Sequence, residues 1–383
     1  MRTILPGSTV GVVGGGQLGR MLAMEARRMG YRTLVLDPSP DSPAAQVADE
    51  QLRAPLDDHD AAHELARRSD VVTLEWENAD VGTLRELEEI VPVRPGPHVL
   101  QVCQHRVNEK DAVRRLGIAT APYRAVVTRE DLDRALADVG TPAVLKTARG
   151  GYDGKGQAVI RTPDQADAAF AALAAPGRKL ILEGFVPFRM EVSVVCARTP
   201  AGQIASFPVA ENLHRNGILD TCVVPAPIAP ELAREARRIA EALAEELDVA
   251  GLLAVEMFVD GDDRLLVNEM APRPHNSGHY TWEACAVSQF EQQLRAVCGL
   301  PLGSTELLRP AAMVNLLGED GGTGLGDPRV VEALGVPEVA LHLYGKPEAR
   351  PGRKMGHLTA LGADAAEALA RARRARQLIR GGR

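Results

Sequence analysis

The sequence predicts a mixed α/β and α+β protein, in which a Rossmann-like parallel sheet precedes units built from antiparallel strands. Apolar runs alternate with helical segments over the first 75 residues, an order typical of parallel βαβ units. A glycine-rich loop near residue 150 separates two further apolar runs, as between neighbouring strands. Apolar runs at 252–259 and from Val267 onward flank the turn 260–263 and predict an antiparallel hairpin.

The composition is typical of a soluble globular protein with two or three domains, since the 383 residues are 45% hydrophobic and 25% charged. The net charge of −7 argues against a broad basic surface for nucleic acid. We find no apolar run of membrane-spanning length and expect no signal peptide. Five cysteines without a CxxC pair indicate reduced thiols, so we expect a cytoplasmic protein.

The N-terminal region predicts a strand at Thr9–Val13, a turn at 14–19, a helix at 20–29 and a strand at 33–36. The turn fits the pattern GxGxxG, and Asp37 lies where a dinucleotide fold places its ribose-binding acid. The same turn serves any anion at a helix N-terminus, so a dinucleotide fold is only one interpretation.

Two polar residues, Glu75 and Asn78, follow the predicted strand Val71–Leu74. They stand just past its carboxyl end, where open α/β sheets bind ligands. The alternative for both is a helix cap. A Pro/Gly-rich turn at 91–97 then marks a domain boundary.

Lys146 ends a predicted strand at 143–146 and precedes a loop with four glycines between positions 150 and 156. Backbone N–H groups of such a loop can fold over phosphates. Only six of the 44 basic residues are lysines, so Lys146 and Lys155 indicate a need for compact ammonium charges. The alternative is a flexible hairpin tip, which does not explain a lysine at the end of an apolar strand.

Glu183 ends a predicted strand at 180–183 and leads into a linker at 184–187, an arrangement that suits contacts to adenine and ribose. A strand with alternating polarity begins at Glu191. We place His214 in a loop at 212–217, where a lone histidine is more often a surface residue.

Glu256 and Glu269 each lie in an otherwise apolar strand of the hairpin, where an unpaired carboxylate is costly. A divalent cation such as Mg²⁺ is a suitable partner, because it takes carboxylate oxygens and keeps phosphates as further ligands. Arg273, His275 and Asn276 follow on a proline-framed segment and add anion-binding groups. We therefore expect a metal–phosphate site, with two arginine-paired structural glutamates as the alternative.

Together, the strand lysine, the glycine loop, Glu183 before its linker and the hairpin glutamates resemble the ATP-grasp superfamily. Within it, four motifs are similar to the N5-carboxyaminoimidazole ribonucleotide synthetase family of purine biosynthesis. They are GGGQLGRM at 14–21, GGYDGKGQ at 150–157, NEMAPRPHNSGH at 268–279 and GRKMGH at 352–357. Four motifs in the family's order are far more specific than any one of them.

The resemblance implies an ATP-grasp fold with four parts. They are a Rossmann-like domain (1–105), a linker and small lid domain (106–186), a central domain with the metal-binding carboxylates (187–300), and a C-terminal β-rich domain with a final helix (301–383). The implied chemistry is that ATP phosphorylates bicarbonate to carboxyphosphate, which then carboxylates the exocyclic amine of aminoimidazole ribonucleotide. The implied cofactors are ATP and two Mg²⁺ ions, with bicarbonate as a substrate.

The resemblance also implies roles for individual residues. The metal ligands are Glu256 and Glu269. Residues that act in catalysis and hold bicarbonate or the amine are Tyr152, Asp153, Lys155, Arg273, His275 and Asn276. Residues that bind ATP are Arg106, Lys146, Gly151, Gly154, Gly156, Gln157, Glu183, Gly184, Phe185, Val186, Glu191, His214, Asn268 and Glu269. Residues that bind the ribonucleotide are Gln17, Leu18, Glu75, Asn78, Arg353 and Lys354.

Two positions depart from the superfamily pattern. Ala271 stands where many ATP-grasp enzymes place a metal-binding asparagine, and strand alternation puts Asn268 on the face opposite Glu269. His105 stands where the pattern has an aspartate before Arg106.

Three other functions compete with this interpretation. They are a sister ATP-grasp ligase of the formate-dependent glycinamide ribonucleotide transformylase or biotin carboxylase type, a non-catalytic nucleotide-binding protein, and a nicotinamide dehydrogenase that would explain only residues 9–37. The resemblance implies a homodimer and a separate downstream mutase, and we expect no nucleic-acid or membrane partner. The six arginines from position 371 onward predict a solvated, fraying end of the final helix.

Overall fold

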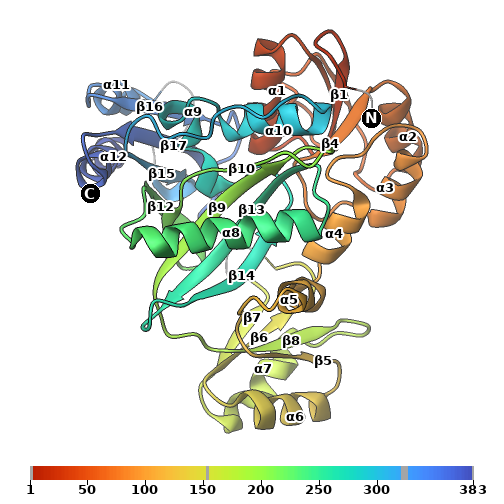
Figure 1. The fold of residues 1–383 in the computed structure, drawn as a ribbon, viewed down its shortest axis with the longest axis vertical. Helices are drawn as coiled ribbons and strands as arrows, with labels where there is room; N and C mark the ends of the chain where they lie inside the picture. Colours follow the sequence, from red (N-terminus) through yellow and green to blue (C-terminus); the bar gives the residue numbers. More distant parts are fainter. Residues whose placement is uncertain (1–2, 152–154, 321–326, 382–383) are drawn as a thin grey trace.

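The computed structural model describes residues 3–151, 155–320 and 327–381, whose strands form three sheets (Figure 1). Tyr152, Asp153 and Gly154 of the glycine loop lie outside the described residues. The small sheet of β5 to β8 lies at one end of the long axis, and the N-terminal and C-terminal parts flank the central sheet at the other end. No helix in the described ranges is long and apolar enough to cross a membrane.

The N-terminal sheet is parallel, with the strand order β3-β2-β1-β4, as the alternation of strands and helices predicts. Its strands are β1 (Thr9–Val13), β2 (Arg32–Leu36), β3 (Glu50–Leu52) and β4 (Val71–Leu74). The helices of this region are α1 (Gln17–Arg28), α2 (His59–Arg67), α3 (Val81–Glu88) and α4 (Pro97–Cys103). Helix α1 begins at Gln17 rather than at Arg20, because Gly16 already serves as its N-cap.

The N-terminus of α1 is occupied by a carboxylate of the protein itself. The Gly16 N–H donates to Glu75 Oε1 at 2.8 Å, and the Gly19 N–H donates to Glu75 Oε2 at 3.3 Å. A Cβ at Gly16 would lie 2.7 Å from Glu75 Oε1, so a side chain here would displace the carboxylate that caps α1. The Gly15 N–H donates to Asp37 Oδ2 at 2.8 Å. The glycine turn therefore binds two acidic side chains of this chain, and Glu75 caps α1.

The small sheet, here called the lid sheet, is antiparallel with the order β5-β8-β6-β7. Its strands are β5 (Tyr123–Val126), β6 (Ala143–Thr147), β7 (Gln157–Ile160) and β8 (Leu180–Gly184). Helices α6 (Arg129–Val139) and α7 (Ala166–Leu173) pack against one face, around Leu145 and Leu182. Because side chains alternate along a strand, Lys146 and Glu183 lie on the opposite face. Helix α5 (Arg106–Arg115) precedes this unit.

The central sheet is the largest and has the order β14-β13-β9-β11-β12-β15-β17-β16, with β10 paired to β9. Its strands are β9 (Phe188–Arg198), β10 (Ile204–Ser206), β11 (Ala210–Arg215), β12 (Ile218–Val224), β13 (Gly251–Asp260), β14 (Leu265–Ala271), β15 (Ala311–Leu317), β16 (Val339–Leu343) and β17 (Lys354–Leu361). The C-terminal strands thus extend the central sheet through the pairing of β12 with β15.

Helices cover both ends of the central sheet. Helix α8 (Pro230–Glu246) packs Ile239 and Leu243 against β9 and β13, and α12 (Ala365–Ile379) packs Ala372 against β15 and β17. The remaining helices are α9 (Thr281–Ala284), α10 (Gln289–Cys298) and α11 (Arg329–Leu334), with short 3-10 turns η1 (Pro163–Gln165), η2 (Asn276–Gly278) and η3 (Gly318–Asp320).

Two predictions fail at single residues: the loop position of His214 and, among the six C-terminal arginines, the solvation of Arg376. His214 lies within β11 rather than in a loop, because the strand continues through a register shift at Leu213/His214. Arg376 is buried rather than solvated, and its Nη1 and Nη2 lie 2.7 and 3.1 Å from the two carboxylate oxygens of Asp220 on β12. This bidentate pair ties the last helix to the central sheet.

Candidate active site

A cavity of about 410 Å³ lies between the lid sheet and the central sheet, and most of the predicted site residues line it. These residues come from all parts of the chain, so the fold brings together side chains up to 276 positions apart (78 to 354). They are Asn78, Arg106, Lys146, Gly151, Lys155, Gln157, Glu183, Gly184, Phe185, Val186, Glu191, His214, Glu256, Asn268, Glu269, Arg273, His275, Asn276 and Lys354.

Glu256 and Glu269 form a directly opposed pair on β13 and β14. Burial, and then the charge of Glu269, raises the pKa of Glu256 to about 7. Burial acts to raise the pKa of Glu269 as well, but the charges of Arg106 and Lys146 outweigh it and hold that pKa below its ordinary value. Two mutually repelling carboxylates fit a divalent cation, whose charge favours the ionised form of both.

The carboxylate pair does not make a complete metal cage. Within the described ranges, no group of three or more His, Cys, Asp or Glu side chains is arranged to hold a metal ion. Mg²⁺ in general takes one or two carboxylates and completes its coordination with water and substrate phosphates.

We expect Glu256→Gln to stabilise the metal-free protein at pH 8. The pKa of Glu256 is about 7 in the folded protein and 4.5 in the unfolded chain, so protonation of Glu256 stabilises the fold. This stabilisation is fully present below pH 4.5 and is lost as the pH rises through about 7. Glutamine is uncharged throughout, so the variant should gain on the order of 1–3 kcal/mol over the wild type at pH 8 and little at pH 4. Urea unfolding in EDTA at both pH values measures the difference.

The matched control for this experiment is Asp262→Asn, in the exposed turn of the same hairpin, which should change little at either pH. If Glu256→Gln is no more stable than the wild type at pH 8, ionised Glu256 does not destabilise the metal-free fold.

Cations approach the carboxylate pair from the lid side. Arg106 lies 3.2 Å from Glu269 (Nη1 to Oε2), and its Nη2 donates to Gly151 O at 3.1 Å. His105, the N-cap of α5, therefore does not turn Arg106 away from the site. Lys146 of β6 and Lys155 beyond the glycine loop line the same cavity. These charges are placed to neutralise an anion held in the cavity.

A bulge in the hairpin changes the position of Asn268. Glu256 opposes Glu269, but Met257 opposes Val267, so Asn268 is the extra residue on β14. Asn268 lines the same cavity as Glu269. The prediction that alternation turns it to the far face is therefore wrong, because the bulge interrupts the alternation.

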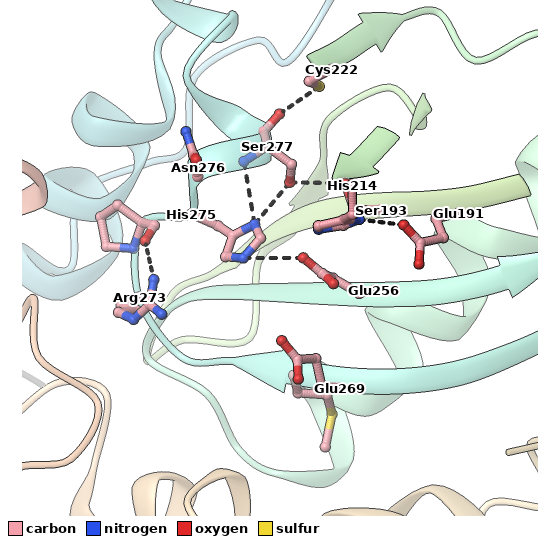
Figure 2. Close-up of polar contacts among 12 residues, drawn as sticks. Glu191, Ser193, His214, Cys222, Glu256, Glu269, Arg273, His275, Asn276 and Ser277 are labelled. Atoms are coloured by element: carbon pink, nitrogen blue, oxygen red, sulfur yellow. Dashed lines mark hydrogen bonds and ion pairs between the residues drawn. The ribbon is translucent and has the colours of Figure 1, made fainter. Parts of the chain in front are cut away.

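The segment that follows β14 presents His275 to the carboxylate pair (Figure 2). His275 Nε2 lies 3.3 Å from Glu256 Oε1, while Nδ1 accepts from the Ser277 N–H at 3.3 Å and lies 2.9 Å from the Ser277 hydroxyl. That hydroxyl accepts from Ser193 Oγ at 2.8 Å. Because Nδ1 is an acceptor, the ring proton is on Nε2. Burial, and then the charge of Arg273, lowers the pKa of His275 well below its ordinary value, so the ring is neutral.

Another part of the cavity is aromatic and borders an acid–histidine pair. Phe185 lines it together with Phe188 and Phe258, whose rings stack with centroids 4.6 Å apart. Glu191 Oε2 accepts a hydrogen bond from His214 Nδ1. Burial opposes protonation of His214, but this hydrogen bond and neighbouring glutamates outweigh it and raise the pKa of the ring. Flat apolar walls beside polar acceptors suit a nucleoside.

Some predicted residues do not line the cavity. Leu18 is buried in the N-terminal core, and Arg353 donates from Nη1 to Glu348 O at 2.9 Å. The described residues with predicted roles that lie outside the lining are Gln17, Leu18, Glu75, Gly156 and Arg353.

Sequence reasoning missed several charged residues of the site. Glu77 lines the cavity and pairs with Arg273, with Oε2 and Nη2 2.5 Å apart. Its place just past β4 was a usable signal. Glu109 and Lys110 are buried on α5, and Lys110 Nζ lies 3.6 Å from Glu183 Oε2. Their spacing of three and four from Arg106 puts them on one helix face, which could have identified them.

Comparisons with known proteins agree with this architecture. The ribonucleotide synthetase preATP-grasp domain matches residues 7–104, the ATP-grasp domain matches 111–290, and the phosphoribosylaminoimidazole carboxylase C-terminal domain matches 311–371. An N5-carboxyaminoimidazole ribonucleotide synthase from Bacillus subtilis (strain 168) is 48% identical over 93% of this chain and 92% of its own. The synthase from Brucella melitensis biotype 1 is 49% identical over 93% and 97%.

Solved structures give the same result. An ADP complex of an N5-carboxyaminoimidazole ribonucleotide synthetase has a TM-score of 0.92 and 48% identity, covering 98% of both chains. An N5-carboxyaminoimidazole synthase from Aspergillus clavatus in complex with ADP and 5-aminoimidazole ribonucleotide has a TM-score of 0.89 and 33% identity, covering 97% of this chain and 98% of its own.

The three-part fold and the cavity between the lid and central sheets define an ATP-grasp ligase that binds ATP. Its C-terminal strands match the carboxylase C-terminal domain, and its relatives share one activity over nearly their whole length. The chain belongs to the N5-carboxyaminoimidazole ribonucleotide synthase family. Its activity is ATP-dependent carboxylation in purine biosynthesis, as the four sequence motifs predict.

Proposed function

We propose that this chain carboxylates the exocyclic amine of 5-aminoimidazole ribonucleotide with ATP and bicarbonate, by way of carboxyphosphate. The observation that carries this proposal is that Lys354 of β17 lines the same cavity as Glu269 and Lys146. A cation on the C-terminal strands can bind the phosphate group of the substrate that accepts the carboxyl group. The Aspergillus clavatus relative, solved with ADP and 5-aminoimidazole ribonucleotide together, supports the same pair of ligands.

Glu256 and Glu269 are the residues that would hold Mg²⁺, with two ions in all. When bound, Mg²⁺ offsets phosphate charge during phosphoryl transfer, a reaction that depends on positioning and charge neutralisation rather than covalent help from the protein. Arg106, Lys146 and Lys155 bind the ATP phosphates. The nucleoside is held by Glu183, Gly184, Phe185, Val186, Glu191 and His214.

The reaction proceeds in two steps. A bicarbonate oxygen attacks the γ-phosphorus of ATP, the bond to the β-phosphate oxygen breaks, and ADP is formed. The amine nitrogen then attacks the carboxyphosphate carbon, the bond from carbon to the phosphate oxygen breaks, and inorganic phosphate leaves with the proton that the nitrogen loses. Arg273, His275 and Asn276 hold the bicarbonate and later the product carboxylate.

The remaining roles follow the family resemblance. Lys354 binds the 5′-phosphate of the ribonucleotide, and Asn78 contacts its ribose or imidazole. The roles of Arg353, Gln17, Leu18 and Glu75 stay predictions, because these residues lie outside the cavity lining. Tyr152 and Asp153, with Gly154, lie outside the described residues, and their contact with the amine stays a prediction.

We also propose that the protein is a cytoplasmic homodimer and that a separate mutase converts its product. All five cysteines are free, which fits a reducing compartment. Light scattering of the purified protein would test the dimer, and a monomer mass would contradict it.

The test of the proposed function is ADP release with Mg·ATP and bicarbonate, with and without the ribonucleotide. We expect turnover to require both bicarbonate and the ribonucleotide. If aminoimidazole ribonucleotide does not change the rate of ADP release, but glycinamide ribonucleotide with formate, or biotin, increases it, the protein is a sister ligase. Binding of ATP without turnover under any of these conditions would indicate a non-catalytic nucleotide-binding protein.

A further inference from the structure

Asn315 is a fully buried asparagine on β15 that touches a residue of the cavity. Its Nδ2 donates to Asn276 Oδ1 at 2.7 Å, and Asn276 Nδ2 donates back to Asn315 Oδ1 at 3.2 Å. Asn276 itself lines the cavity beside His275. The two side chains thus form a reciprocal amide pair between the C-terminal strands and the segment that follows β14.

A third contact fixes the orientation of this pair. Asn315 Nδ2 also donates to Leu219 O at 2.6 Å, and a backbone carbonyl can only accept. Both hydrogens of Asn315 Nδ2 are therefore used, and its Oδ1 must accept from Asn276. Asn276 in turn cannot exchange the positions of its oxygen and nitrogen without placing two acceptors against each other.

This orientation decides what Asn276 offers to a ligand. Its oxygen and one amide hydrogen face Asn315, and no further partner of its Nδ2 is present in the part of the chain that the structure describes. The second amide hydrogen is available as a donor. A donor suits the negatively charged oxygens of bicarbonate or of a carboxylated product, whereas an exposed amide oxygen would repel them.

We propose that Asn315 is a positioning residue that holds Asn276 with its N–H, rather than its carbonyl, toward an anionic oxygen in the cavity. The inference rests on the proposed function, in which Asn276 holds bicarbonate and the product carboxylate. Asn315 lies in the strand pair that also carries Lys354, since Leu317 of β15 opposes Lys354 of β17. The C-terminal strands therefore orient both the acceptor site and the bicarbonate site.

The decisive variant is Asn315→Asp, because a carboxylate can only accept and removes the N–H that holds Asn276 Oδ1. The carboxylate repels Asn276 Oδ1, so the Asn276 amide is no longer held with its N–H toward the anion. We expect the KM for bicarbonate to rise roughly 10-fold or more, the usual loss when a hydrogen bond to a charged group is removed, while the KM for ATP stays within about twofold. Asn315→Ala, which only frees Asn276, should have a smaller effect of the same kind and covers the case in which the aspartate variant does not fold.

The matched control is Thr359→Ala on β17, a buried polar residue whose hydroxyl has no hydrogen-bond partner within the described ranges. It removes a polar group from the same sheet without contact to Asn276, and the KM for bicarbonate should not change. Equal increases in both KM values for Asn315→Ala, or the same increase in the control, would reduce Asn315 to a structural role and overturn the inference.

A double-mutant cycle tests whether Asn315 acts through Asn276. In an Asn276→Ala background, adding Asn315→Ala should cause no further loss in kcat/KM for bicarbonate. Losses that multiply would overturn the inference. If the wild type shows no bicarbonate-dependent turnover, the proposed function fails, and a crystal structure of Asn315→Ala then decides the inference: an unchanged Asn276 side chain would overturn it.

Discussion

Glu269→Gln should lower ADP release by at least about 10³-fold at saturating ATP, bicarbonate and ribonucleotide. Replacing a residue that only supports a metal ligand typically costs 10- to 100-fold, and a direct ligand should cost more. The substitution keeps the shape of the side chain but removes the charge that faces Arg106 at 3.2 Å and opposes Glu256 across the hairpin. Steady-state ADP release as a function of Mg²⁺ concentration measures the loss.

The matched control is again Asp262→Asn, which removes a carboxylate from the same hairpin outside the cavity lining. It should keep wild-type turnover. A melting temperature of Glu269→Gln close to that of the wild type would show that the loss is chemical rather than structural. Turnover within tenfold of the wild type would remove Glu269 from the metal site.

Local patterns predicted the parts of the fold that depend on local sequence. The strands β1 and β4 begin and end where alternation and flanking turns place them, and the hairpin that carries Glu256 and Glu269 is present. The bulge at Asn268 was not predictable, because a bulge is defined by the pairing of two strands and leaves little trace in either strand alone.

Contacts between distant segments account for the other errors. Arg376 lies in an arginine-rich helix that is typical of a solvated terminus, and only the position of Asp220 on another strand explains its burial. The GxGxxG turn predicted an anion at α1, but the anion is Glu75, 59 positions away from Gly16. In both cases the sequence indicated which kind of interaction the segment makes, but not which residue is the partner. Tertiary packing brings the partner into place.

The same limit applies to the site. Motif residues such as Lys146, His275 and Lys354 were found because their chemistry stands out in sequence. The partners of two other motif residues, Asn276 and Arg273, do not stand out in the sequence. Asn315, which contacts Asn276, is one amide in an apolar strand, and Glu77, which contacts Arg273, is one of several acids near β4. Their importance arises from contacts at 2.5–2.7 Å that exist only in the folded chain.

Lys354→Ala should raise the KM for the ribonucleotide about 10- to 100-fold and leave the KM for ATP within about twofold. A hydrogen bond between an ammonium group and a phosphate is charge-assisted, and its loss from a bound state is worth roughly 1.5–3 kcal/mol. At saturating ribonucleotide, kcat should fall much less than kcat/KM, because a remote phosphate contact acts mainly in binding. Initial rates with each substrate varied in turn measure this separation.

The control is Arg350→Ala, an exposed arginine that pairs with Glu348 in the same connection and lies outside the cavity lining. Lys354→Ala and Arg350→Ala each remove one positive charge. If both raise the KM for the ribonucleotide equally, the effect comes from long-range attraction rather than from a contact at Lys354. A defect confined to ATP would place Lys354 on the donor side. The acceptor side is favoured because four strands of the central sheet (β9, β11, β12 and β15) separate β17 from the hairpin of β13 and β14, which carries the carboxylate pair. The sheet thus sets the distance between the two phosphate-binding groups, and a change at one end should leave the other intact.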